Sequence, residues 1–95
     1  MYNEKQRLNQ LIKSSQGEPF ASDKYGPVSQ DTLCSFLQEH KFCISLNDIE
    51  FKKSHSVFLD GLPFIQDVFH ISKLDITVKI RCEFIFQWQF YFENN

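Results

Sequence analysis

Apolar and polar residues alternate without a break along the last part of the chain. From position 74 to position 92 every even residue is apolar, and nearly every odd residue is polar. A period of two places the two sets on opposite faces of a β-sheet, so we predict a strand with one buried face. The apolar set consists of Leu74, Ile76, Val78, Ile80, Cys82, Phe84, Phe86, Trp88, Phe90 and Phe92.

The length of this segment conflicts with the size of the protein. A straight strand over residues 74–93 would span about 65 Å, whereas a chain of 95 residues folds into a globule about 30–35 Å across. The strand must therefore bend, contain a turn, or project and pair with another chain. A two-residue loop would move the apolar set to odd positions, and residues 64–95 include no Gly or Pro to form one. We predict a continuous coiled strand, and a three-residue loop near residues 81–83, which keeps the parity, is the alternative.

A short helical pattern opens the chain. Within residues 1–15, Leu8, Leu11 and Ile12 recur at helical spacing and predict a helix with a narrow apolar stripe. The loop that follows, over residues 16–28, is longer than most connections in compact domains. We favour packing of this helix on its own sheet, and docking on a neighbouring molecule is left open.

A second helix is predicted over residues 30–41, because apolar residues recur on one face at i, i+3, i+4 and i+7. Ser29 is a suitable N-cap, and Val28 occupies the position of a hydrophobic staple. We expect this helix to lie on a sheet. Its apolar face consists of Leu33, Phe36, Leu37 and His40.

The middle of the chain predicts further strands. Residues 42–46 alternate, and the alternation resumes out of phase after the Asn-Asp pair at 47–48, which fits two strands joined by a turn or bulge. The Asp-Gly pair at 60–61 lies between apolar runs and predicts a tight hairpin. Residues 62–71 fit either the returning strand, with Pro63 marking an edge, or a short helix, and the helical spacing fits slightly better.

These elements define the predicted fold class, α+β. Two N-terminal helices pack on a mostly antiparallel sheet of roughly three to five strands, which includes a long aromatic C-terminal strand. Residues 1–95 form a single domain in this prediction. It comprises the short helix of residues 1–15, the loop of residues 16–28 and an α+β core over residues 29–95.

Charge and composition bear on the class of partner. The formal net charge is −2 and Lys and Arg are dispersed, so nonspecific binding to nucleic acid is not indicated. The aromatic residues of the C-terminal strand lie on the opposite face from Lys79 and Arg81, whereas sheets that stack bases need both on one face. We therefore expect no nucleic-acid partner, and we interpret the 11 Phe residues mainly as packing material.

Targeting signals and cysteine usage indicate the compartment. Residues 1–15 lack the apolar stretch of a signal peptide, and no apolar run approaches the ~20 residues of a membrane span. Three cysteines are too few, and odd in number, for a secreted disulfide framework. We therefore expect a cytoplasmic protein with no membrane partner.

The residue types of a zinc site are present but badly spaced. Cys34 and His40 lie on the predicted helix about 120° apart around its axis, so they cannot easily share a metal with Cys43 and Cys82. No histidine or cysteine lies in a motif of nucleophilic catalysis, and the sequence has no Gly-rich phosphate loop or metalloprotease motif. We predict no metal, no cofactor and no enzymatic activity.

Exceptions on the polar face of the C-terminal strand are the candidate contact residues. Ile85 and Tyr91 emerge among the uncharged amides of Gln87 and Gln89, and Arg81 lies on the same face. Large apolar groups among uncharged amides lower the cost of covering a surface. These five residues are predicted to bind a partner.

The predicted function follows from an over-long strand and the lack of a chemical motif. We expect a small non-catalytic module that binds another protein through its sheet, in the manner of an inhibitor or an immunity protein. The long strand favours pairing with a partner, including a homodimer through the C-terminal strand. The alternative is a small apolar ligand-binding domain, in which a curved sheet and its helices enclose a Phe-lined pocket.

Overall fold

The computed structural model describes residues 3–26, 29–59 and 62–93, and these contain two α-helices and a five-stranded antiparallel sheet. The predicted α+β class is therefore confirmed. The elements are α1 (Glu4–Ser14), β1 (Ala21–Asp23), α2 (Ser29–Glu39), the 3₁₀ helix η1 (Leu46–Asp48), β2 (Ile49–Leu59), β3 (Leu62–Ile71), β4 (Ile76–Ile85) and β5 (Gln87–Glu93). The strands lie in the order β1-β5-β4-β3-β2.

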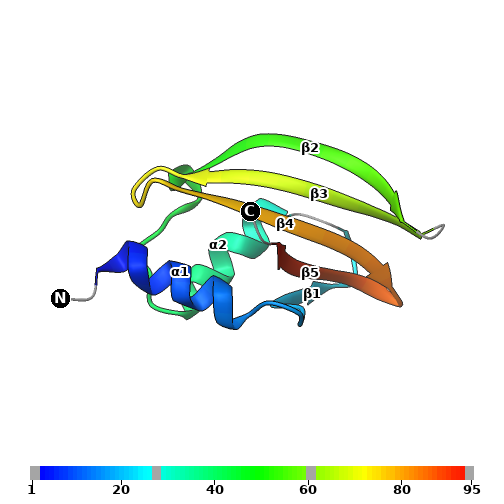
Figure 1. Ribbon diagram of the computed structural model, residues 1–95, viewed down its shortest axis with the longest axis horizontal. Helices are drawn as coiled ribbons and strands as arrows, with labels where there is room; N and C mark the ends of the chain where they lie inside the picture. The colour runs from blue at the N-terminus through cyan, green and yellow to red at the C-terminus, as the bar shows by residue number, and fades with distance from the viewer. Residues whose placement is uncertain (1–2, 27–28, 60–61, 94–95) are drawn as a thin grey trace.

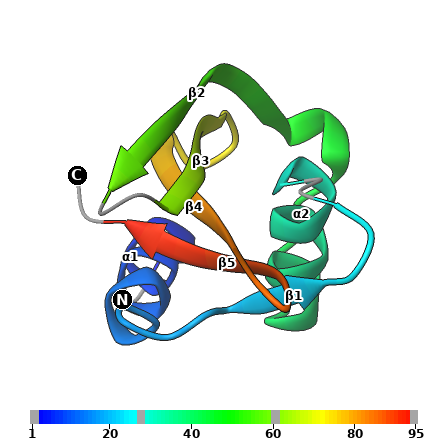
Figure 2. The ribbon, with the colours of Figure 1, turned by 90° about the vertical axis from the view of Figure 1, so that its right-hand side faces the viewer.

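The sheet is long and curved, and the helices cover only part of one face. Figure 1 shows α1 and α2 on one side of the sheet, while the β4–β5 hairpin and the neighbouring ends of β2 and β3 extend beyond them. Viewed along the strands, the sheet curls from β2 to β1 with α2 on its concave side (Figure 2). The overall extents are 45 × 25 × 21 Å. One end of the sheet is therefore outside the helical layer.

The C-terminal segment forms two strands, so the prediction of one continuous strand over residues 74–93 is wrong. The chain reverses at Phe86 and returns as β5, with Phe84 opposite Trp88 and Ile85 opposite Gln87. This loop preserves the parity of the alternation, as the alternative required, but it lies beyond residues 81–83. Phe86 adopts a left-handed φ of 64°, so the turn forms without Gly or Pro. The reversal removes the conflict between strand length and protein size.

β3 is a strand throughout, so the preference for a helix over residues 62–71 is wrong and the strand alternative is right. It lies between β2 and β4, and Pro63 therefore does not mark an edge strand. Pro63 pairs with Phe58 of β2, while pairing with β4 begins one residue later, at Phe64. A residue without an N–H group is tolerated there because the ladder to β4 has not yet begun.

Other expectations for the loops and strands are met in part. Pairing of Leu59 with Leu62 confirms the hairpin at residues 60–61, although these two residues lie outside the described part of the chain. Residues 42–45 form no strand and lead instead into η1. β1 was not predicted, because its three residues show no alternation of their own and are placed by pairing with β5.

Both predicted helices are present, and the first packs on its own sheet as we favoured. Leu8 is completely buried, and Leu11 and Ile12 pack against the core. A capping box between Asn3 and Gln6 begins α1. The predicted staple residue of α2, Val28, lies outside the described residues. Both helices and the sheet share one core, whose fully buried side chains are Leu8, Leu33, Leu37, Ile71, Ile80, Cys82 and Phe90.

Arg7 joins α1 to the C-terminal end of α2. Its Nη1 donates to the carbonyl oxygen of His40 at 2.7 Å, and its Nη2 donates to that of Lys41 at 3.2 Å. The guanidinium also lies 3.7 Å from the centroid of the Phe42 ring. A cation beside the last carbonyls of a helix satisfies acceptors that have no partner within the helix. The contact therefore holds the two helices together at one end.

Candidate functional site

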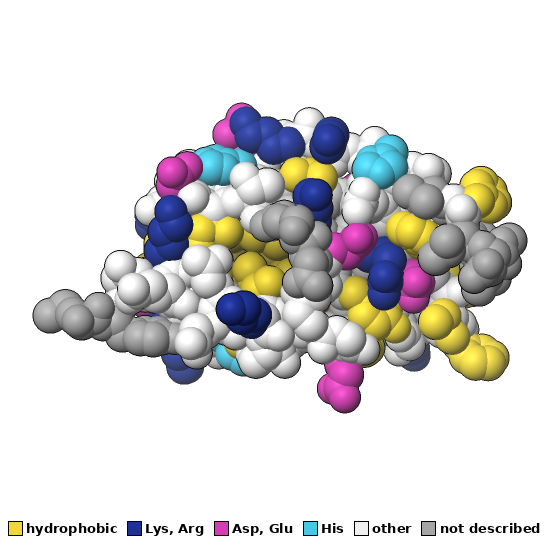
Figure 3. Space-filling model, viewed as in Figure 1, with side chains coloured by type: hydrophobic (Ala, Val, Ile, Leu, Met, Phe, Trp, Pro, Cys, Tyr) yellow, Lys and Arg dark blue, Asp and Glu magenta, His cyan; other side chains and the backbone are white. Residues whose placement is uncertain are grey.

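Large apolar side chains are exposed at the end of the sheet that the helices do not cover. Phe86 is 99% exposed, Phe58 73%, Phe84 60% and Ile85 47%. These four residues are termed the aromatic end. In Figure 3, hydrophobic side chains gather at the right-hand end of the molecule, where Figure 1 places the β4–β5 turn and the end of β2. Several large apolar groups exposed to water at one end of a molecule are typical of an interaction surface.

Strand register explains why these residues lie at one end of the sheet. Phe58 pairs with Pro63 near the start of β3, and Phe84 pairs with Trp88 across the β4–β5 hairpin. The β3–β4 ladder ends at the pair Phe64 and Glu83, so Phe84 lies at the same end of the sheet as Pro63. Opposed residues in an antiparallel sheet point to the same face, so Phe58, Phe84 and Trp88 lie on one face of the sheet, with β3 between Phe58 and Phe84. The rings of Phe84 and Trp88 meet edge-on with centroids 5.5 Å apart.

This arrangement corrects the predicted burial of the alternating set. Cys82, Phe90 and Phe92 are buried as predicted, but Phe84 and Phe86 are exposed. Alternation indicates which face of a sheet a residue occupies, whereas burial depends on where the covering helices end. Phe58 was missed because no local signal in the sequence places the end of β2 beside the β4–β5 turn.

The predicted partner-binding residues occupy the opposite face of the same hairpin, which is termed the outer face. There the Arg81 guanidinium lies 4.8 Å from the centroid of the Tyr91 ring, and the Tyr91 hydroxyl donates to Gln89 Oε1 at 2.9 Å. Ile85 pairs with Gln87 beside the turn. The structure thus brings all five residues onto one hairpin, with Tyr91 in contact with both Arg81 and Gln89. Ile85 belongs to both the outer face and the aromatic end.

The charge beside the aromatic end is balanced. Arg81 Nε lies 3.2 Å from Glu83 Oε1 on the same strand. Such a partly exposed ion pair contributes little to stability, but it neutralises the last two ionised side chains of β4. From residue 84 to residue 92 the sequence has no charged side chain. The tip of the hairpin is therefore apolar and uncharged.

A buried polar cluster lies at the N-terminal end of α2. Ser29 Oγ donates to Asp67 Oδ2 at 2.6 Å and lies 3.0 Å from Cys82 Sγ, and all three residues are buried. Burial raises the pKa of the Cys82 thiol to about 11, and the nearby Asp67 carboxylate acts in the same direction. The thiol is therefore protonated at neutral pH and is a poor nucleophile. The Ser29 hydroxyl provides the hydrogen bond that a buried carboxylate requires.

The other cysteines and His40 also have structural surroundings. Cys34 is buried, and this burial, with the carboxylates of Asp31 and Asp48, raises the pKa of its thiol. Cys43 is exposed, and its thiol is free. The His40 ring packs on Phe36, with centroids 4.5 Å apart. Within the described ranges, no group of three His, Cys, Asp or Glu residues is arranged to hold a metal ion.

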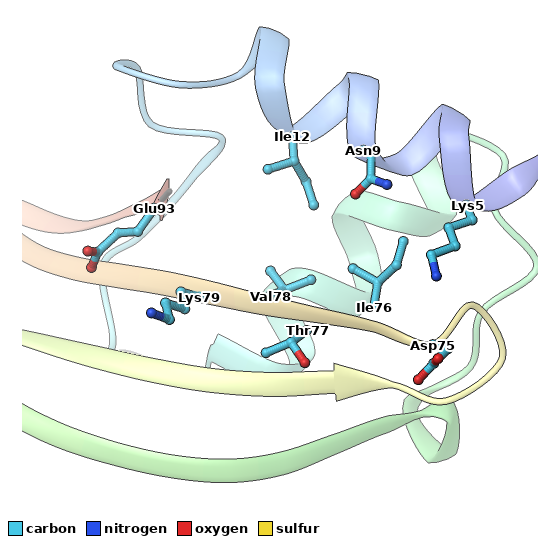
Figure 4. A pocket seen from close by; sticks show the side chains of 9 residues that line it. All are labelled: Lys5, Asn9, Ile12, Asp75, Ile76, Thr77, Val78, Lys79 and Glu93. Atoms are coloured by element: carbon cyan, nitrogen blue, oxygen red, sulfur yellow. The ribbon is translucent and has the colours of Figure 1, made fainter. Parts of the chain in front are cut away.

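Two hollows lie near the helices. One of about 250 Å³ lies between α1 and β4, and Figure 4 shows Ile12 of the helix facing Ile76 and Val78 of the strand, with Lys5 and Asn9 beside them. The other, of about 310 Å³, is lined by Phe20 and Phe36 but also by three carboxylates, those of Asp23, Asp31 and Glu39. These mixed linings differ from the mostly apolar walls of a ligand pocket. The Phe-lined ligand pocket stays a prediction, which a thermal-shift screen with small apolar compounds would test.

The comparisons with known proteins do not identify a family. No protein-family model, curated protein or solved structure matches the chain. Among the described residues, no helix combines the length and the apolar character needed to cross a membrane. The function must therefore be argued from the surfaces of the molecule itself.

Proposed function

We propose that this protein is a small non-catalytic module that binds another protein through the aromatic end and the adjoining outer face of the β4–β5 hairpin. The observation that carries the proposal is the exposure of four large apolar side chains, three of them aromatic, at one end of the sheet. Covering such groups removes apolar surface from water, which is the main driving force of protein association. An inhibitor or an immunity protein acts by this kind of direct contact.

The proposed contact is made by side chains rather than by strand addition. β4 and β5 both lie inside the sheet, so most of their hydrogen-bonding edges are already used by neighbouring strands. A partner therefore meets the aromatic rings and the outer-face amides. β1 pairs with only Trp88, Gln89 and Phe90 of β5, so self-association through strand edges has only the rest of that edge available.

The environment of the buried nucleophiles supports a non-catalytic role. The Cys82 thiol is completely buried and its pKa is raised, and Ser29 is occupied by Asp67. A catalytic nucleophile needs access to substrate and a base that activates it. The first condition is not met at this cluster, because Ser29, Asp67 and Cys82 are all buried.

Photo-crosslinking from the aromatic end tests the proposal. Phe58 and, in a second variant, Phe84 are replaced by benzoyl-phenylalanine, and both variants are irradiated in extract of the source cells. We expect both positions to join to the same protein. With that protein purified, Phe58→Ser should weaken binding by about tenfold or more, because exposed aromatic residues often dominate interface energies.

Phe51 provides a matched control. It lies on the same strand as Phe58, at the strand's other end, and is 53% exposed. The photoreactive analogue at position 51 should not crosslink to that protein, and Phe51→Ser should change the dissociation constant by less than about twofold. Equal crosslinking from position 51, or unchanged binding by Phe58→Ser, would contradict the proposed surface.

A further inference from the structure

Phe86 occupies the apex of the β4–β5 turn in conditions that do not favour phenylalanine. Its φ of 64° lies in the left-handed region, where the Cβ of an L-residue is crowded and Gly or Asn is preferred. Its side chain is almost completely exposed, so packing against the described residues does not offset the strain. The fold alone gives no reason for a large aromatic residue at this position.

The comparable positions elsewhere in the chain have ordinary explanations. Within the described ranges, Lys41 and Asp75 are the other non-glycine residues with positive φ. Lys41 follows α2, and a left-handed residue commonly closes a helix. Asp75 has a short polar side chain, which tolerates this region of backbone conformation. Phe86 differs from both because its side chain is large and apolar.

We propose that Phe86 is the anchor residue with which the aromatic end enters an uncharged apolar cleft of a different protein. In this proposal the contact with the partner, and not packing within the fold, accounts for a large aromatic residue at this strained position. The inference rests on the proposed function and adds to it the chemistry and shape of the partner's surface.

The charges around Phe86 indicate an uncharged partner surface. The hairpin has no charged side chain from residue 84 to residue 92, and Arg81 and Glu83 neutralise each other. Proteins that bind anionic lipid normally carry free Lys or Arg beside the apolar groups. The four residues of the aromatic end include no Lys or Arg. The amides of Gln87 and Gln89 can instead form hydrogen bonds at the polar rim of a protein interface.

The exposed area indicates a cleft rather than a second copy of this chain. With about 200 Å² for each fully exposed side chain of this size, the exposed fractions of the four residues of the aromatic end correspond to about 550 Å². Two copies meeting end to end would bury about twice this area, which is less than the roughly 1,200 Å² at which stable interfaces begin. A cleft encloses the sides of the hairpin as well as its apex, so it also buries partly exposed residues of the outer face such as Gln87, Gln89 and Tyr91.

Phe86→Asn separates binding from folding. Asparagine tolerates the left-handed region, so the variant should melt at the same temperature or up to about 5 °C higher. Its affinity for the protein identified by crosslinking should fall by about 100-fold or more. A melting temperature lowered by several degrees would show that Phe86 serves the fold, and an unchanged affinity would show that it is not the anchor. Either result overturns the proposal.

Lys41→Gly is the matched control. Lys41 has a φ of 67° and an exposed side chain, and it lies beside α1 at the C-terminal end of α2. The glycine variant should raise the melting temperature by a similar amount, because it relieves the same kind of backbone strain. Its affinity for the partner should match that of the unmodified protein.

Tests of other occupants complete the experiment. Flotation with phosphatidylcholine vesicles, with and without phosphatidylserine, should show no binding that depends on Phe86, and light scattering should show a mass independent of concentration. Vesicle binding or self-association lost in Phe86→Asn would overturn the cleft in favour of a membrane or a second copy. Crosslinks that map to a flat or charged surface of the partner would also overturn it.

The outcomes separate this inference from the proposed function. A partner that crosslinks from positions 58 and 84 but binds Phe86→Asn normally leaves the proposed function standing and removes Phe86 as the anchor. Failure of both positions to yield a partner removes the proposed function and the inference together.

Discussion

The two ends of the sheet are built from the same alternation of residues and meet opposite surroundings. At the covered end, Ile80, Cys82 and Phe90 are completely buried between the sheet and the helices. At the aromatic end, Phe84 and Phe86 continue the same alternation but are exposed, because the end of the β4–β5 hairpin extends beyond α1 and α2 (Figure 1). The alternation therefore specifies a face of the sheet, while the extent of the helices determines which part of that face is buried. One end contributes stability, and the other is free to make contacts.

Alanine at matched aromatic positions should show the largest difference between the two ends. Phe90→Ala leaves a cavity in the core and should lower the free energy of unfolding by about 3–5 kcal/mol. Phe84→Ala removes mainly an edge-on contact with Trp88 and should cost about 1 kcal/mol or less. Urea unfolding of both variants measures these values. Similar losses for the two variants would mean that the aromatic end is part of the folding core.

Removal of the buried hydrogen bond between Ser29 and Asp67 should cause the next largest loss of stability. Ser29→Ala leaves the Asp67 carboxylate without the 2.6 Å hydrogen bond and should cost about 1–3 kcal/mol. Ser35→Ala, at an exposed position of the same helix, should change stability by no more than about 0.5 kcal/mol.

A second substitution checks the cause of that loss. Ser29→Ala combined with Asp67→Asn should recover part of the stability, because an unpaired buried amide costs less than an unpaired carboxylate. A double variant less stable than Ser29→Ala alone would place the loss in packing and not in the unpaired charge.

Thiol labelling should distinguish the covered core from exposed surface without any substitution. Cys43 is exposed and should react with iodoacetamide in the folded protein, whereas Cys34 and Cys82 are buried and should react on unfolding. With a pKa of about 11, roughly one Cys82 thiol in a thousand is ionised at pH 8. Peptide mass spectrometry over time measures each rate. Labelling of Cys82 as fast as Cys43 would show that the covered end opens readily.

The sequence is informative about elements and less so about how they are assembled. The stripes that contain Leu8 and Leu33 predict the two helices correctly, since a helix shows its buried face locally. The turn at Phe86 could not be predicted. Gly and Pro usually mark a turn, but here Phe86 adopts the positive φ instead. β3 has helical spacing but is a strand, because pairing on both sides outweighs the local pattern.

The candidate site shows the same limit. Ile85 was predicted to be a contact residue because it interrupts the polar face, and the structure places it at the exposed end. Phe84 and Phe86 were assigned to the buried face, since no sequence pattern indicates where a helix stops covering a sheet. Phe58 carries no signal at all, because its neighbours at the aromatic end come from a distant part of the chain.

Substitution of Asp48, which ends η1 just before β2 begins, should have the smallest effect on stability. That effect should depend on pH. Its Oδ2 accepts hydrogen bonds from the backbone N–H of Ser45 at 2.8 Å and from Ser45 Oγ at 3.0 Å, and Lys73 Nζ lies 3.5 Å away. The Ser45 N–H bond in particular lowers the pKa of Asp48 below its ordinary value. The carboxyl group is thus more acidic in the folded chain than in the unfolded chain.

The sign of the pH dependence follows from this difference. The ionised carboxylate stabilises the fold above the ordinary pKa of about 4, and this contribution is lost as the pH falls through the folded pKa. Asp48→Asn should therefore lower the melting temperature slightly at pH 7, and the difference from the unmodified protein should shrink as the pH is lowered from about 5 to about 2. A difference that stays constant over this range would assign the stabilisation to hydrogen bonding that a neutral amide cannot reproduce, and not to the charge of Asp48.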